Sequence, residues 1–168
     1  MTRIPMLLAA ALAASSGAAM AADQQFAEKA AQGGMAEVAL GKLGATQGST
    51  DAIKTFAQTM VDDHGKANDE LKEAAEKDGI TLPSDVSAEQ RATAQRLSAL
   101  KGQAFDREFV RVMVHDHEQT VALFEKEAKS GTDPNLKAFA HSTLPTLKNH
   151  LHMAKHLQNS GEGSHASH

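Results

Sequence analysis

Apolar residues recur at intervals of three and four along most of the chain, with polar residues between them. This spacing is typical of amphipathic α-helices, whereas β-strands alternate with a period of two. It predicts four long helices, over about residues 23–46, 51–78, 103–130 and 134–158. Between the second and third of these, Pro83 interrupts any helix, and a capping box from Ser87 to Gln90 opens a short helix that ends near Leu100. The chain is therefore predicted to be all-α.

The loops between the predicted helices differ in length, and their lengths suggest the topology. A short break around Gly48 separates the first two long helices, and Gly131 to Pro134 separates the last two. Short loops join antiparallel neighbours, so each pair forms a hairpin. The stretch from Gly79 to Gly102 is a long crossover between the two hairpins. This arrangement is a ferritin-like four-helix bundle, which we expect as one domain over residues 22–158.

The two ends of the chain differ in composition from this domain. Arg3 precedes an apolar run from Met6 to Ala14, and small residues follow as far as Ala21, as in a secretory signal peptide. The apolar run is shorter than the roughly 20 residues of a membrane span. We expect residues 1–21 to be cleaved, leaving a periplasmic or secreted protein without a membrane span. Residues 159–168 are predicted to be a disordered, histidine-containing tail.

Composition narrows the chemistry that the domain can perform. The 168 residues include nine His but no Cys, Trp or Tyr, which excludes disulfides, thiolate metal sites and tyrosyl radicals. The formal net charge is −4 with the signs scattered, so no basic patch for nucleic acid is predicted. The Ala-rich surface with few aromatics argues against a strong protein interface and leaves room for a weak homo-oligomer. The candidate chemistry belongs to His, Asp and Glu.

Each long helix carries one titratable residue on its apolar face. These residues are Glu37, His64, His117 and His150. Counted from the hairpin loops at about 1.5 Å per residue, Glu37 is level with His64, and His117 with His150, to within about 6 Å. The four side chains could therefore form one cluster. Three imidazoles and a carboxylate suit Zn, Fe, Mn or Cu. A metal site in the bundle core is therefore one interpretation of this pattern.

The same four residues have a second interpretation. A buried histidine is often a hydrogen-bonded core residue, and the set could be a packing network that fixes the helix register. Asp63 and Asp116 could orient a histidine of a neighbouring helix or only line the edge of the core. Separately, His152 and His156 are four residues apart on the polar side of the last helix, where they could weakly chelate a divalent ion at the surface.

Several motifs resemble the bacterial domain of unknown function 4142 (DUF4142) family. The resemblance runs from Phe26 to Leu157 and is carried by GGMAEV at 33–38, MVDDH at 60–64, DHEQTV at 116–121 and LPTLKNH at 144–150. It implies an exported, ferritin-like helical bundle whose activity is not established. The E-x-x-H pairs of di-iron proteins are missing, because Val61, Val114 and Leu147 stand three residues before the core histidines.

These observations favour a non-catalytic function. We expect an exported protein that binds a transition metal in its core, for storage, buffering or stress protection. The alternative is a structural, interaction or envelope-stress protein without metal, in which the core His and Glu residues form a packing network. An oxidoreductase with a di-metal centre, built from the same four residues with Asp63 and Asp116, is less favoured.

Overall fold

The structure is a computed structural model that describes the backbone of residues 11–163 and the side chains of residues 20–161. Its elements within that range are helices joined by loops, and no strand occurs there. The helices are α1 (Ala11–Gln47), α2 (Asp51–Lys77), α3 (Ala88–Ser98), α4 (Gly102–Ser130) and α5 (Pro134–Gly163). The all-α prediction is thus confirmed for the described part of the chain.

Two helices run further than their amphipathic patterns predict. Helix α1 begins at Ala11 instead of near Asp23, so it continues through the second half of the expected signal peptide. Helix α5 continues to Gly163, so residues 159–163 of the expected tail are helical. A helix ends where its backbone hydrogen bonds end, and the apolar face does not mark that residue. Residues 1–10 and 164–168 lie outside the described range.

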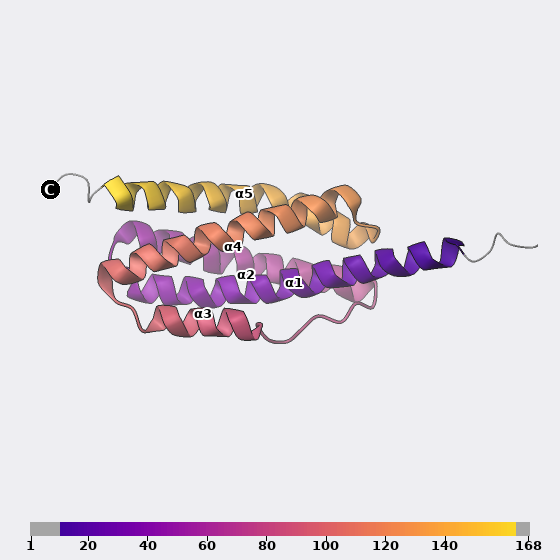
Figure 1. The fold of residues 1–168 in the computed structure, drawn as a ribbon, viewed down its shortest axis with the longest axis horizontal. Helices are drawn as coiled ribbons and strands as arrows, with labels where there is room; N and C mark the ends of the chain where they lie inside the picture. The colour runs from indigo at the N-terminus through magenta and orange to yellow at the C-terminus, as the bar shows by residue number, and fades with distance from the viewer. Residues whose placement is uncertain (1–10, 164–168) are drawn as a thin grey trace, which may run out of the picture.

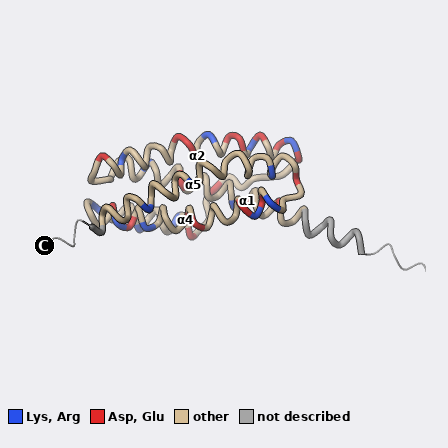
Figure 2. Tube along the Cα trace, turned by 90° about the horizontal axis from the view of Figure 1, so that it is seen from above, with Lys and Arg blue, Asp and Glu red and all other residues tan. Residues whose placement is uncertain are grey.

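The four long helices pack in a ring of pairwise contacts (Figure 1). Helix α1 packs on α2, α2 on α5, α5 on α4, and α4 on α1, so α2 and α4 are diagonal neighbours. The short helix α3 lies outside this ring, against α1 and α4. Basic and acidic residues are interspersed along α2 (Figure 2). Over residues 11–163, no helix combines the length and hydropathy that a membrane crossing requires.

Side-chain caps fix where several helices begin. The Thr50 hydroxyl accepts a hydrogen bond from the Ile53 amide at the start of α2. At α3, Ser87 and Gln90 form the predicted reciprocal capping box. Asp133 accepts bonds from two amides in the first turn of α5, where Pro134 is the first helical residue. These local signals are readable in the sequence, and they set the short loops that hold each hairpin together.

Small residues let α1 approach α2 closely. A Cβ at Gly41 would lie 2.8 Å from the Ala57 carbonyl oxygen, and one at Gly44 would lie 2.7 Å from the Ala57 Cβ. Such contacts are closer than real Cβ atoms tolerate, so any larger residue would push the two helices apart. The glycines therefore bring Glu37, one turn before Gly41, close to the middle of the helical core.

Two apolar clusters fill the core. The first contains Phe56, Phe105, Phe109 and Met113, and the second contains Phe26, Leu71, Phe124 and Phe139, among others. Edge-to-face aromatic pairs occur in both, including Phe56 with Phe109 and Phe26 with Phe124. On α2 and α4, the central histidine stands in sequence between a residue of the first cluster and a residue of the second. The histidines thus occupy the polar layer between two apolar layers.

Candidate metal centre

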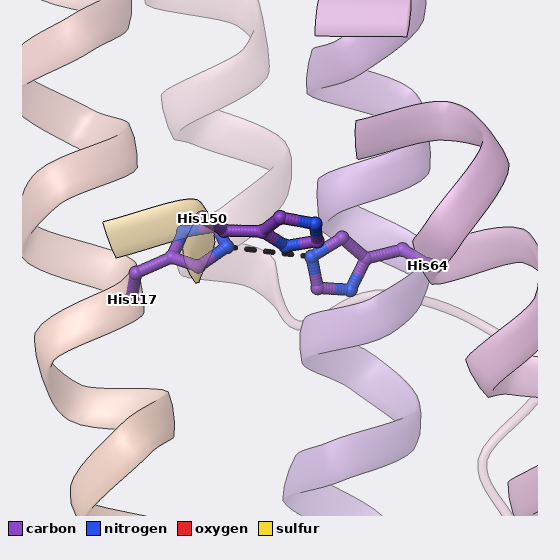
Figure 3. Close-up of side chains that lie close together, drawn as sticks. All are labelled: His64, His117 and His150. Carbon is purple, nitrogen blue, oxygen red and sulfur yellow. Dashed lines mark hydrogen bonds between the residues drawn. The ribbon is translucent and has the colours of Figure 1, made fainter. Parts of the chain in front are cut away.

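Three histidines from three helices meet in this polar layer. His64 on α2, His117 on α4 and His150 on α5 each offer a ring nitrogen, and these three atoms lie within 4.8 Å of one another. Their side chains are buried, with exposed fractions of 6%, 1% and 1%. Figure 3 shows the rings turned toward one another, with the His150 ring beside the line that joins the other two. The structure therefore brings together three of the four predicted core residues.

The protonation of His117 follows from its backbone partner. Its Nδ1 lies 2.9 Å from the carbonyl oxygen of Met113, one turn earlier on α4. A carbonyl only accepts, so Nδ1 carries the proton and Nε2 carries a lone pair. That Nε2 lies 3.4 Å from Nε2 of His64. The main chain of α4 thus aims an unprotonated nitrogen at the neighbouring imidazole.

His150 is oriented by a carboxylate from another helix. Its Nε2 lies 2.8 Å from Oδ2 of Asp63, which is on α2 beside His64. The ring therefore donates from Nε2, and the lone pair is on Nδ1, which is buried and has no hydrogen-bond partner. A carboxylate that holds the far nitrogen of an imidazole is the usual outer partner of a metal-binding histidine. Of the two roles considered for Asp63, the structure shows the orienting one.

Burial keeps all three imidazoles neutral at neutral pH. Desolvation lowers the pKa of His64 well below its usual value, and the charges of His117 and His150 lower it further. The pKa of His117 falls to about 4, first through burial and then through the charge of His150. Burial also lowers the pKa of His150, although Asp63 partly opposes this shift. A neutral imidazole is the form that binds a metal. The three histidines therefore need not lose a charge-bearing proton before an ion binds.

Glu37 lies beside this cluster, outside the group of three nitrogens. Its Oε1 is 3.6 Å from Nδ1 of His117, which already donates to Met113. The Glu37 side chain is buried, and Oε2 has no hydrogen-bond partner. Burial, followed by the negative charge of Asp116, raises the pKa of Glu37 well above its usual value. The sequence placed Glu37 among the ligands, whereas the structure places its carboxyl against the outer nitrogen of a histidine.

The surface histidines are separate from the core. His152 and His156 are both exposed on α5. Within the part of the chain that the structure describes, the three core histidines are the one group of three or more His, Asp or Glu side chains close enough to share an ion. The predicted surface pair therefore has no third protein ligand among these residues.

Comparison with known proteins places the chain in a family. A crystal structure of a DUF305 fragment from Deinococcus radiodurans is similar, with a TM-score of 0.73 over 83% of this chain and 96% of that chain. The sequence identity is 15%, so this likeness concerns the fold alone. No curated protein matches the chain. The family described as domain of unknown function (DUF4142) matches residues 8–157, as the sequence motifs predict, and the chain belongs to that family.

Proposed function

We propose that this chain is an exported, ferritin-like four-helix-bundle protein that binds one transition-metal ion in its core. His64, His117 and His150 are the proposed ligands, and the proposed role is storage, buffering or stress protection without catalysis. The observation that carries the proposal is the convergence of three buried, neutral imidazoles within 4.8 Å. Two of them are already oriented through their outer nitrogens, by Met113 and by Asp63.

The spacing of one pair of nitrogens supports a tetrahedral ion. Zn–N bonds of about 2.0–2.1 Å at tetrahedral angles separate two nitrogens by about 3.3 Å. Nε2 of His64 and Nε2 of His117 are 3.4 Å apart, which is long for a hydrogen bond and close to this value. A site of imidazoles without a carboxylate also favours Zn and Cu over Mn, which prefers oxygen ligands.

A packing network without metal leaves more polar atoms unsatisfied. His64 could donate from Nε2 to His117, but Nδ1 of His150 would still be buried without a partner. An unsatisfied buried acceptor costs on the order of 1–3 kcal/mol. One ion would satisfy all three nitrogens at once, which is the reason to prefer the metal interpretation.

The proposed export is supported by where packing begins on α1. Met20, Ala21 and Ala22 are exposed, and Asp23 and Phe26 are the first buried side chains among residues 20–161. Cleavage after Ala21 would therefore remove no described buried side chain. Intact-mass analysis of protein recovered from the periplasm should give a chain that begins at Ala22 or within two residues of it. Recovery of the uncleaved chain would contradict the proposed export.

Metal titration with matched variants tests the proposed site. We expect the mature chain, with His165 and His168 changed to Ala to remove tail ligands, to bind one Zn or Cu ion and to melt at a higher temperature when loaded. His117→Ala should abolish the tight site, while the surface control His152→Ala should keep it. Loss of tight binding in the control alone would move the site to the surface of α5. Absence of tight binding in the parent protein would favour the metal-free structural alternative.

A further inference from the structure

A small space adjoins His64, the one core histidine in its lining. It has a volume of about 30 Å³, and its lining includes Glu37 of α1, His64 of α2 and Thr143 of α5. This volume suits about one water molecule. The remaining lining is largely apolar and includes Leu71, Phe124 and Phe139 of the core. The space is therefore a polar niche, set into the apolar core next to a proposed metal ligand.

Two polar atoms at this niche have no partner. Oε2 of Glu37 and Oγ1 of Thr143 are both buried without a hydrogen bond, and the two residues are only 5% and 9% exposed. Buried polar atoms nearly always have a partner, which is often an ordered water. Because both residues line the same space, a single small ligand could satisfy both atoms.

We infer that this niche is the exchangeable coordination position of the metal centre, where a water-sized ligand bound to the ion is held by hydrogen bonds with Glu37 and Thr143. The inference rests on the proposed function, because three histidines leave the fourth position of a tetrahedral ion open. Water is the resident ligand, and a small anion replaces it by ligand exchange without any change of oxidation state. The site would then bind small molecules as well as the ion.

The niche also has a route to the outside. A larger cavity of about 690 Å³ lies between α1, α3 and α4, and it shares Gly33, Glu37 and Thr120 with the niche. A Cβ built at Gly33 meets no atom within 4 Å, so this position faces open space. Ligands and ions would therefore pass beside Gly33 and Glu37, beneath the short helix α3.

Azide binding to the Co(II)-loaded mature chain tests the coordination position. We expect azide to change the visible Co(II) spectrum saturably. Thr143→Val should weaken azide binding about fivefold, as the loss of one hydrogen bond would, and Glu37→Gln should also alter it. Thr143→Ser should restore the affinity, and Thr146→Val, an exposed position on the same helix, should leave it unchanged. Each variant should still bind one Co(II) ion.

Two outcomes of this experiment separate the inference from the proposed function. If Co(II) binds to the histidines but azide leaves the spectrum unchanged, the coordination position is wrong and the metal site stands. If no Co(II) binds to the histidines, the proposed function itself fails. Equal azide affinity in Thr143→Val and the wild type would remove Thr143 from the ligand position.

The route is tested by filling the open position on α1. Gly33→Leu should slow Co(II) loading and azide exchange at least tenfold, with the final stoichiometry unchanged. Gly65→Leu is the matched control, because a Cβ at Gly65 also meets nothing within 4 Å and Gly65 lines neither cavity. Equal loading rates in the two variants would overturn the route.

Discussion

The molecule contains two buried polar clusters, the core histidines and a second cluster around Asp23, which differ in how their atoms are satisfied. At the end of the core, Asp23 of α1 accepts hydrogen bonds from the amides of Thr132 and Asp133 and from the Thr132 hydroxyl. Burial opposes the ionisation of Asp23, but these bonds outweigh it and lower its pKa. Its carboxylate thereby ties α1 to the loop between α4 and α5.

The histidines lack donors of the kind that surround the Asp23 carboxylate, although the Asp23 cluster also has one unbonded buried atom, Oε1 of Glu127. His117 and His150 are each bonded through one nitrogen, and their other nitrogens face the centre of the cluster. There Nδ1 of His150 has no hydrogen-bond partner, and Nε2 of His117 has only Nε2 of His64 at 3.4 Å. The comparison separates two uses of a buried polar group. A carboxylate surrounded by protein donors stabilises the fold, whereas a buried lone pair without a donor, as at Nδ1 of His150, supports the proposed ligand from outside the chain.

The largest expected effect concerns the histidines in acid. In the unfolded chain a histidine takes up its proton near pH 6.5, whereas in the folded chain the pKa of His117 is about 4. The unfolded state binds more protons between these values, so the contribution of His117 to the stability of the metal-free protein is complete above about pH 6.5 and falls toward pH 4. His117 alone contributes on the order of 3 kcal/mol to this loss.

Chemical denaturation of the metal-free protein across this range checks the slope. His117→Leu should remove the share of the slope that belongs to His117, and the exposed control His152→Leu should keep the full slope. A slope that is unchanged in His117→Leu would contradict the neutral, buried state of this histidine.

Removing the partner of His150 should weaken metal binding next most strongly. Asp63→Ala should lower metal affinity about 10–100-fold, because outer partners orient the ligand and raise its basicity. Asp62→Ala is the matched control, since Asp62 is exposed and bonds only Gln58 among the described side chains. Competitive metal titration measures both affinities. Equal losses in the two variants would mean that local charge, and not the bond to His150, determines the affinity.

The end cluster should respond in the opposite way. Asp23→Ala should lower the free energy of unfolding by about 1–2 kcal/mol, because the amides of Thr132 and Asp133 lose their acceptor. Metal affinity should not change. Asp69→Ala, an exposed change on α2, serves as the control for lost negative charge. A metal affinity that falls with Asp23→Ala would show that the two clusters are coupled.

Glu127 should show the reverse dependence on pH. Burial, followed by the charge of nearby Asp23, raises its pKa to about 7. The folded state then holds a proton that the unfolded chain releases near pH 4.5, so this contribution to stability is lost as the pH rises through about 7. Glu127→Gln should flatten the loss, as seen by denaturation between pH 5 and 8. The exposed change Glu125→Gln should leave the loss in place.

Much of the helical framework was predictable because it depends on local signals. The ends of α2, the capping box of Ser87 and the start of α5 at Pro134 all follow from neighbouring residues. The convergence of the three histidines followed from helical periodicity and from the lengths of the hairpins. These features need only the geometry of a regular helix.

Other features depend on distances between helices, which periodicity does not supply. The sequence grouped Glu37 with the histidines, but a helical wheel cannot tell which ring nitrogen a carboxyl will face. The sequence also left the bond from His150 to Asp63 undecided. It gave no signal for the niche at Thr143, because this niche depends on how four helices pack. The buried pair of Asp23 and Glu127 was also missed, because these residues are 104 positions apart in the sequence.

An anomalous-difference map from crystals of the Zn-loaded mature protein tests the central claim most directly. We expect one strong peak about 2.0–2.1 Å from Nε2 of His64, Nε2 of His117 and Nδ1 of His150, with Asp63 still bonded to Nε2 of His150. A fourth, non-protein ligand should lie toward Thr143. A map with its peak at His152 and His156, and none among the three core histidines, would contradict the account.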